Sequence, residues 1–544
     1  MLPRAGLPPA FSLLPSALSL LLATSLLLAF CPPASASPYN AELTDWNLNV
    51  VQSTTDPTQY NSTRANTTYT QSPGNWRSLP VYTVLLDKFA DGDPSNNDFF
   101  NSSFEHDWRE TQLRFGGDVR GLQSKLDYLQ GMGIGVIFIA GTAFLNMPWQ
   151  ADSYSPIDFT TLDPHWGNIN DWIAFIDEVH ARGMYIMSDF TVGTMGDMIG
   201  FSGYLNTSAP LNMDEYDCIW KRPSYAPWGI DQYLDFDIDN GHNSTCQFPP
   251  FWDDTGAELN ISTTNGCRLS DFDQYGDLEA FGVHPDWQRQ ITKFASVQDR
   301  LREWQEPVMD KLTNFACMFI RALDIDAIRI DKSTQVTLDA LSKWTTAARA
   351  CAASVGKTNF LITGEVTGGN TFGSLYIGRG RTPTQLPNPD LATINNMTSS
   401  ENQYFLRDAP ENGLDGVAFH YSTYRSLTRF LGMDGNLQVA DDVDVNFVNA
   451  WNQMFVTNDF INPTSGHTDP KHMFGTSNFD VFRWPSLVNG TQRSVLATFI
   501  TTLVMPGVAL YYYGEEQNFY LYDNGASNYL FGYVYLKLVF FFIC

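Results

Sequence analysis

Three apolar runs of this chain carry carboxyl side chains that are suited to acid–base chemistry. The run IDAIRIDKSTQV, residues 325–336, has Arg329 and Asp331 two positions apart, so a strand would place both on one face. Glu365 lies near the end of FLITGEV (360–366), and Asp459 lies at the end of MFVTND (454–459). An arginine beside an aspartate keeps that carboxylate ionised, whereas burial and a nearby negative charge keep a second carboxyl protonated. The pattern therefore predicts one ionised and one protonated carboxyl in a shared site.

Cleavage of a glycosidic bond with retention of configuration requires this combination of carboxyl groups. One carboxylate acts as nucleophile, and a second carboxyl acts first as acid and then as base. Asp331 fits the nucleophile, and Glu365 fits the acid/base, with a pKa that burial and the charge of Asp331 should raise. For Arg329 and Asp331 taken alone, a structural ion pair is the preferred alternative. Glu365 and Asp459 after other strands favour catalysis instead.

Eight apolar runs of strand length alternate with amphipathic segments and would position these groups. The runs are residues 81–89, 135–140, 184–190, 326–331, 360–366, 416–421, 454–459 and 507–514. Segments with apolar residues at helical spacing lie between them, as in NINDWIAFIDEVHARG. The alternation predicts an α/β fold, a (β/α)8 TIM barrel with its site at the C-terminal ends of the strands. Residues 191–295 lack clear periodicity and are too long for a loop, so we expect a small domain inserted after strand three.

Four segments occur in an order that resembles the α-amylase family of glycoside hydrolases, family 13. They are SDFTVG, IRIDKS, ITGEVT and FVTNDF, and flanking segments such as LRFGGDVRGLQ and GVALYYYGEEQ extend the resemblance over roughly residues 80–516. The resemblance implies a barrel with an insert after strand three. It also implies that Asp459 is the third carboxylate, which braces the sugar in the transition state. Substrate-binding roles follow for Arg329, Asp189 and Tyr154, although core packing is an equal alternative for Tyr154.

Departures from the family pattern narrow this resemblance. Gly193 and Thr194 stand where the family's first motif ends in Asn-His, and Thr334 and Gln335 stand where its second motif ends in Lys-His. FVTND lacks the histidine before the final aspartate and is one residue short. These histidines usually hold sugar hydroxyls, so efficient starch hydrolysis is not expected. The segments SDFTVGTMGDMIGF and LSDFDQYGDLEAFG are similar instead to the extracellular amylase-like domain of fungal cell-wall α-1,3-glucan synthases, which are much longer, membrane-embedded proteins.

The loop DKFADGDPSNND is rich in the hard oxygen ligands that Ca²⁺ prefers. It resembles a calcium loop of some bacterial α-amylase-family enzymes that a Gly-Gly-Asp segment closes. The ligands that the resemblance implies are Asp91, Asp93, Asn96, Asn97, Gly116 and Asp118. The alternative is a polar turn without a metal. No zinc site is expected, because the chain has no CxxC pair.

The N-terminal residues have the pattern of a secretory signal. Arg4, the apolar run SALSLLLATSLLLAF and an Ala-x-Ala site predict a signal peptide over residues 1–36, and the apolar run is short for the alternative of a membrane anchor. Eight Asn-x-Ser/Thr sequons fit a secreted glycoprotein in the cell wall or at the extracellular face of the plasma membrane. Five cysteines between the ends, Cys218, Cys246, Cys267, Cys317 and Cys351, are disulfide candidates whose pairing stays open.

The net charge of −27 argues against nucleic acid as a partner. The expected partner is an α-glucan polysaccharide or oligosaccharide. The expected order is a signal peptide (1–36), an irregular glycosylated lead-in (37–76), the first part of the barrel (77–190), an inserted region (191–295), the second part of the barrel (296–528) and an atypical apolar tail (529–544).

The leading hypothesis is an extracellular α-glucan-active domain with retaining glycosidase or transglycosylase chemistry, in a fragment of a larger synthase. One alternative is a glucan-binding scaffold module without catalysis, which the absent histidines motivate. The other is an ordinary secreted α-amylase or α-glucosidase.

Overall fold

The computed structural model describes part of the chain. The described residues are 43–48, 64, 67–97, 99, 114–146, 152–196, 298–301, 303, 306–336, 338–366, 376–377, 413–421, 423–424, 427, 470–481, 483–486 and 492–520. The expected signal peptide, the apolar tail, the asparagines of all eight sequons and nearly all of the expected insert lie outside these residues. Among the helices that are described, none is both long and apolar enough to cross a membrane.

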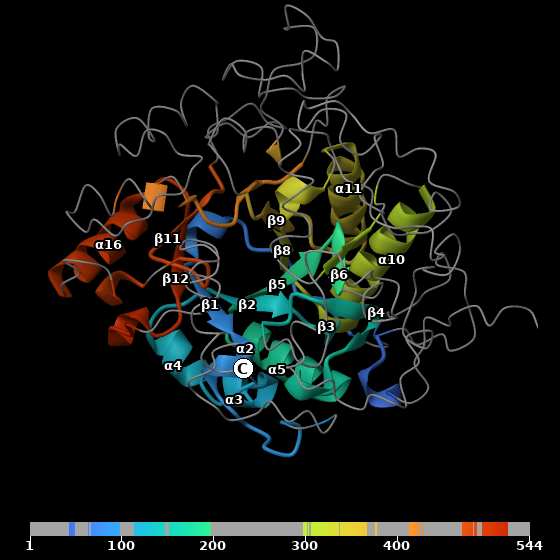
Figure 1. Ribbon diagram of the computed structural model, residues 1–544, viewed down its shortest axis with the longest axis horizontal. Helices are drawn as coiled ribbons and strands as arrows, with labels where there is room; N and C mark the ends of the chain where they lie inside the picture. The colour runs from blue at the N-terminus through green and yellow to red at the C-terminus, as the bar shows by residue number, and fades with distance from the viewer. Residues whose placement is uncertain are drawn as a thin grey trace, which may run out of the picture.

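Eight parallel strands form one sheet that nearly closes into a barrel (Figure 1). In chain order they are β1 (Val81–Leu85), β2 (Val136–Thr142), β5 (Tyr185–Thr191), β8 (Ala327–Asp331), β9 (Leu361–Gly364), β10 (Gly416–Val417), β11 (Met473–Gly475) and β12 (Val508–Tyr512). Their spatial order, β10-β9-β8-β5-β2-β1-β12-β11, is the chain order taken around a ring. Across the remaining gap, the N–H of His420 donates to the carbonyl oxygen of Met473, 3.2 Å away. The expected (β/α)8 TIM barrel is confirmed.

The sequence patterns explain the two layers of the barrel. Every residue of β1, β2 and β8 is buried, as expected for parallel strands whose outer face is covered by helices. Figure 1 shows these helices around the strands: α3 (Val119–Gln123), α4 (Leu126–Gly131), α5 (Ile169–Ala181), α10 (Glu306–Leu323), α11 (Leu338–Ser354) and α16 (Gln492–Val504). In α5, Asn168 and Asp171 form a capping box, and Trp172 and Phe175 face the core.

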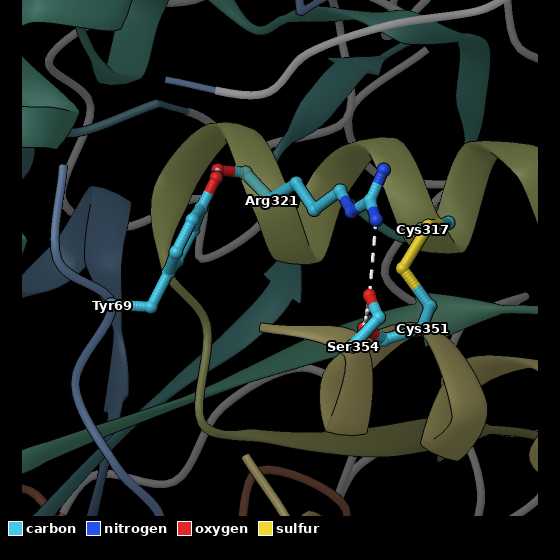
Figure 2. Close-up of a disulfide and its surroundings, with 5 residues drawn as sticks. All are labelled: Tyr69, Cys317, Arg321, Cys351 and Ser354. Atoms are coloured by element: carbon cyan, nitrogen blue, oxygen red, sulfur yellow. Dashed lines mark hydrogen bonds between the residues drawn. A yellow bond between two sulfur atoms is a disulfide. The ribbon is translucent and has the colours of Figure 1, made fainter. Parts of the chain in front are cut away.

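A disulfide joins two neighbouring helices of the outer layer (Figure 2). Cys317 of α10 and Cys351 of α11 are bonded, with their Cα atoms 5.5 Å apart. Beside the disulfide, Arg321 Nη2 donates to Ser354 Oγ at 3.0 Å, and the Tyr69 hydroxyl donates to the carbonyl oxygen of Arg321, also at 3.0 Å. The segment before β1 is therefore tied to the same helix pair. The three other candidate cysteines lie outside the described residues.

The expected seventh strand is placed differently by the structure. The strand beside β12 is β11, Met473–Gly475, whereas residues 454–459 lie outside the described residues. The apolar run 454–459 has strand composition, but the shorter run 473–475 has the register that pairs with Val508–Leu510. The sequence prediction therefore assigned the seventh strand to residues about twenty positions too early.

The stretch expected to be an inserted domain begins and ends at one place. The short strands β6 (Thr194–Gly196) and β7 (Gln298–Arg300) pair antiparallel directly after β5. The chain thus leaves the barrel along β6 and returns along β7. Because nearly all residues between these strands lie outside the described part, the inserted domain stays a prediction.

A cluster of buried charges lies at the N-terminal ends of β5 and β8. We call it the lower cluster, and it consists of His180, Asp324, Asp326 and Lys357. Lys357 Nζ lies 2.5 Å from Asp326 Oδ1 and 2.6 Å from Asp324 Oδ1. His180 Nε2 lies 2.7 Å from Asp326 Oδ2. The N–H of Ile186 also donates to Asp326 Oδ2 at 2.9 Å, which attaches the cluster to the start of β5.

Candidate active site

Arg329 of β8 is the centre of the candidate active site. Its Nη1 lies 2.9 Å from Asp331 Oδ1 and 3.0 Å from Asp189 Oδ1, at the end of the adjacent strand β5. Asp189 Oδ2 accepts hydrogen bonds from the Tyr154 hydroxyl at 2.7 Å and from the N–H of Gly141 at 2.9 Å. The guanidinium carbon of Arg329 also lies 5.6 Å from the Tyr154 ring centre. The structure thus brings together Asp331, Arg329, Asp189 and Tyr154, all of which were candidate site residues in the sequence.

Glu365, which follows β9, shares the same arginine. Arg329 Nη2 lies 3.1 Å from Glu365 Oε2, and the N–H of Lys332 donates to this oxygen at 3.1 Å. The Tyr421 hydroxyl, beyond β10, donates to Glu365 Oε1 at 3.3 Å. One guanidinium therefore contacts both carboxyls that the sequence named as nucleophile and acid/base, and it fixes their relative positions.

The third carboxyl of the described site is Asp480, which the sequence prediction missed. The Tyr421 hydroxyl lies 3.3 Å from Asp480 Oδ2 and so connects this carboxyl with Glu365. Asp480 follows β11, and its N–H donates to Asn478 Oδ1 at 2.9 Å. Asp459, which was predicted for this role, lies outside the described residues.

A signal for Asp480 was present in the sequence. The segment FGTSNFD, residues 474–480, has an asparagine and an aspartate around one residue, with Phe479 where the family has histidine. FVTND was one residue short because it lacks this middle position. In the structure, the Phe479 ring lies 5.8 Å from the Arg329 guanidinium and 5.4 Å from the Tyr154 ring. An aromatic side chain therefore occupies the place where a hydrogen-bonding histidine was expected.

Burial and charge give the two central carboxyls opposite protonation preferences. Burial alone would raise the pKa of Asp331, but the charges of Lys332 and Arg329 outweigh burial and hold this pKa below its usual range. Burial raises the pKa of Glu365, and the negative charge of Asp331 adds to this effect. Burial and the charge of Glu365 also raise the pKa of Asp480 well above its usual range. Asp331 is therefore the ionised member of the group, as the sequence predicted.

Asp189 has a different balance of the same effects. Burial raises its pKa to about 6, although Arg329 acts in the opposite direction. Its two oxygens are engaged by Arg329 and by the Tyr154 hydroxyl. This arrangement suits a residue that holds the arginine and the tyrosine in place.

Two departures from the family pattern are neighbours in space. Thr334 and Gln335 lie in the buried turn η8 (Ser333–Gln335), and a Cβ built on Gly193 would lie 3.6 Å from the carbonyl oxygen of Gln335. Gln335 Oε1 is buried and has no hydrogen-bond partner among the described residues. Substitutions in two separate motifs therefore change one corner of the site together.

The predicted calcium ligands converge in the structure. Asn97 Nδ2 lies 3.0 Å from Asp91 Oδ2, and a Cβ built on Gly116 would lie 2.5 Å from the Asn97 amide. Asp118 accepts from the N–H groups of Gly92, Asp93 and Gly121, whereas Asp93 Oδ2 lies 2.7 Å from Arg120 Nη1. The Oδ1 atoms of Asn96 and Asn97 are buried without a hydrogen-bond partner among the described residues. Two orphaned amide oxygens in the loop that carries Asp91 fit a hard cation.

Carboxylates alone do not form this site. Within the described residues, no group of three or more His, Cys, Asp or Glu side chains is arranged to hold a metal ion. A cation in this loop would therefore depend on amide and carbonyl oxygens, as the predicted ligands Asn96, Asn97 and Gly116 imply.

Comparison with known proteins agrees with this geometry. Residues 83–236 match the model of the α-amylase catalytic domain. The chain is 50% identical over 499 residues, 92% of its length, to the cell wall α-1,3-glucan synthase mok11 of Schizosaccharomyces pombe, and 49% identical over 512 residues, 94% of its length, to mok13 of the same organism. It spans only about a fifth of these relatives, 20% and 21%.

A solved structure supports the fold independently. The crystal structure of an Anoxybacillus α-amylase superposes with a TM-score of 0.52 at 16% identity, covering 87% of this chain and 78% of that one. The chain thus matches an α-amylase catalytic domain in a barrel of the same fold and, over more than nine tenths of its length, is about half identical to cell-wall α-1,3-glucan synthases.

Proposed function

We propose that this chain is the α-glucan-acting domain of a cell-wall α-1,3-glucan synthase, and that it cleaves and transfers α-glucan segments by a retaining mechanism. One observation carries the proposal. Asp331 and Glu365 contact the same guanidinium at 2.9 Å and 3.1 Å, yet their pKa values are shifted in opposite directions. An ionised nucleophile beside a protonated acid is the starting state of a retaining glycosidase.

The proposed reaction proceeds in two displacements. A carboxylate oxygen of Asp331 attacks the anomeric carbon while Glu365 gives its proton to the departing glycosidic oxygen, so that a covalent glycosyl-enzyme forms and the leaving chain departs as an alcohol. Glu365, now ionised, then takes the proton of an incoming hydroxyl, whose oxygen displaces Asp331. Water as the incoming group gives hydrolysis, and a sugar hydroxyl gives transfer.

The surrounding residues have supporting roles in this proposal. Arg329 holds Asp331 and Glu365 at a fixed separation, and Asp189 holds Arg329. Asp480 and Tyr421, hydrogen-bonded to each other, present groups that can bind sugar hydroxyls beside the acid/base. We favour transfer because the relatives are named as synthases and because the histidines typical of starch hydrolysis are absent.

The test is a comparison of Asp331→Asn with the wild-type chain on defined α-1,3 and α-1,4 oligosaccharides, with sizing of the products. Loss of activity by roughly four orders of magnitude or more is expected, because no nucleophile remains. Mass spectrometry of a trapped 2-deoxy-2-fluoro glycosyl adduct on the Asp331 peptide is the direct readout. Unchanged product formation by Asp331→Asn would disprove the assignment.

A glucan-binding scaffold without catalysis is the second candidate. Both oxygens of Asp331 already have cationic partners, Arg329 Nη1 at 2.9 Å and Lys332 Nζ at 3.0 Å. A scaffold would bind the oligosaccharides without forming an adduct, whereas adduct formation would exclude it. Rapid release of reducing sugar from starch would favour an ordinary secreted amylase instead.

We also propose Ca²⁺ as a structural ion of the loop 91–97. Asp91, Asn96 and Asn97, together with Gly116 and Asp118, would hold it, and Asp93 would have to share its carboxylate with Arg120. The ion would neutralise the loop's charge and supply no step of the reaction. A rise in Tm on addition of Ca²⁺, abolished by chelator and by Asn97→Ala, tests this site.

Secretion through a signal peptide over residues 1–36, with glycosylation at the sequons, is part of the same proposal. It rests on the sequence pattern, because these residues lie outside the described part of the chain. Expression in a fungal host, with N-terminal sequencing and glycosidase treatment of the cell-wall fraction, tests it. A mature N-terminus after Ala36 and a loss of mass on deglycosylation are expected.

A further inference from the structure

Lys332 is placed against both catalytic carboxyls by an unusual backbone conformation. Its φ is +49°, in the left-handed region that non-glycine residues seldom adopt. From this position its N–H donates to Glu365 Oε2 at 3.1 Å, while its Nζ lies 3.0 Å from Asp331 Oδ2. The Nζ also lies 5.9 Å from the Tyr154 ring centre. The two displacements described above assign no step to the ammonium group or to this conformation.

The contact occupies the oxygen that the reaction needs. Arg329 Nη1 binds Asp331 Oδ1, and this bond can persist through the reaction because Oδ1 need not attack. Oδ2 is the remaining oxygen, and the ammonium of Lys332 lies on it at hydrogen-bond distance. A sugar whose anomeric carbon approaches Oδ2 must displace this ammonium. The Lys332 side chain is 12% exposed, so it is not enclosed in the core.

We propose that Lys332 is a displaceable counter-ion of the nucleophile, which blocks Asp331 Oδ2 until a bound glucan moves the ammonium aside. This inference rests on the proposed function and specifies how the same site is regulated by its substrate. A long α-glucan, bound along several subsites, supplies the binding energy that breaks the ion pair. A short or poorly bound sugar does not, and it is turned over slowly.

The charged surroundings of the nucleophile determine what removal of the ammonium does. The groups that face Asp331 are Arg329 on β8, Asp189 on β5, Glu365 after β9, Asp480 after β11, and Asp152 and Tyr154 in the segment before β4 (Pro156–Leu162). Without Lys332, Arg329 is the main cation left to oppose them. The pKa of Asp331 should then rise, so the acidic limb of the kcat/KM profile should move to higher pH.

The experiment compares Lys332→Met, Lys332→Arg and wild type on an α-maltosyl fluoride. This substrate is short, and its fluoride leaves without acid assistance, so fluoride release reports the attack of Asp331. Lys332→Met keeps the aliphatic stem and removes the charge. We expect first-turnover fluoride release to rise by roughly tenfold, the factor that one charge-assisted hydrogen bond is worth in a buried site. The acidic limb should move to higher pH, and Lys332→Arg should restore both wild-type properties.

The controls separate the possible outcomes. Lys343→Met makes the same chemical change at an exposed position of α11 and should behave as wild type. Lys332→Asn, which tolerates the left-handed conformation, replaces Lys332→Met if the Tm shows that the latter is unfolded. Fluoride release by Lys332→Met that is slower than, or equal to, that of wild type overturns the inference while leaving the proposed function intact.

The proposed function has its own distinct failure. If neither wild type nor Lys332→Met releases fluoride faster than Asp331→Asn, both the function and the inference are wrong. An inactive wild type combined with an active Lys332→Met would support the inference most strongly, because removal of the ammonium alone would then expose a working nucleophile.

Discussion

The two ends of the barrel hold buried charges in opposite ways. In the lower cluster, Asp324 and Asp326 are matched by Lys357 and His180, and every carboxylate has a cation within 3.3 Å. At the C-terminal end, the cations that the described residues place against a larger group of carboxyls are Arg329 and Lys332; these carboxyls are Asp189, Asp331, Glu365 and Asp480. The first arrangement is electrically balanced, and the second has a deficit of positive charge.

The deficit has a chemical consequence. Where cations are too few, buried carboxyls bind protons instead, and the pKa values of Glu365, Asp480 and Asp189 are accordingly raised, first of all by burial. In the lower cluster the partners outweigh burial. Burial alone would lower the pKa of His180, but its bonds to Asp324 and Asp326 raise this pKa to about 9, so His180 keeps its proton. The comparison shows that the number of partners, rather than burial alone, decides which end can exchange protons during a reaction.

The largest expected effect tests whether Asp480 or Asp459 is the third carboxyl of the site. Asp480→Ala should lower kcat/KM by about three orders of magnitude, because a group beside the acid/base that binds sugar hydroxyls is lost. Its stability should not fall by a comparable amount, since the removed carboxyl is buried and its ionised form is disfavoured by burial and by Glu365. Asp459→Ala is the matched variant and should keep its activity within about threefold. The reverse pattern in parallel kinetic assays would restore Asp459 to the role first predicted for it.

At the balanced end, removal of one cation should damage the fold and spare the chemistry. Lys357→Met leaves Asp324 and Asp326 with one cation for two buried carboxylates and should lower the free energy of unfolding by about 3 kcal/mol. Urea unfolding measures this loss, and kcat of the folded fraction should be unchanged. Lys343→Met, on the exposed face of α11, is the control. A loss of kcat without a loss of stability would contradict the assignment of this end to stability.

The lower cluster should also set an alkaline limit to stability. His180 has a folded-state pKa of about 9, above its ordinary value of 6.5, so it contributes stability fully below pH 6.5 and loses that contribution as the pH rises through about 9. A pKa rise of this size corresponds to about 3 kcal/mol. Urea unfolding from pH 6 to pH 10 should show this decline in wild type. In His180→Gln the curve should be lower at pH 6 and flatter, and an unchanged slope would show that His180 is not the group responsible.

Sequence and structure agree most closely where one pattern dictated the element. Buried apolar runs gave β2, β5, β8 and β9 within about two residues of their predicted ends, because a parallel strand covered on both faces is largely apolar. The predicted run 81–89 instead divides into β1 and the short helix α2 (Leu86–Phe89). β11 was missed because three residues carry too little pattern, and a longer apolar run nearby resembled a strand more closely. Because of this difference, the sequence prediction named Asp459, which lies outside the described residues, as the third carboxyl and did not name Asp480.

Other features of the structure could not be predicted from sequence patterns alone. Arg329, Asp331 and Glu365 could be placed because strand ends of a barrel converge on one face. The position of Lys332 depends on its left-handed backbone. The lower cluster depends on residues from α5, the turn before β8 and the segment after α11 meeting in space. Neither has a periodic signature, so neither could be read from the sequence.

The smallest expected effect tests whether burial is the reason that the lower cluster contributes to stability. Arg182, two residues after His180, pairs with Asp127 of α4 at 2.6 Å, but the Asp127 side chain is 92% exposed. Water screens such a pair, and holding two flexible side chains together offsets the attraction. Asp127→Asn should therefore leave the urea midpoint unchanged within error, although the pair is as short as those of Lys357. A measurable loss of stability would mean that ion pairs at this end stabilise the barrel whether or not they are buried. The buried pairs of Lys357 would then not differ in kind from the exposed pair of Arg182 and Asp127.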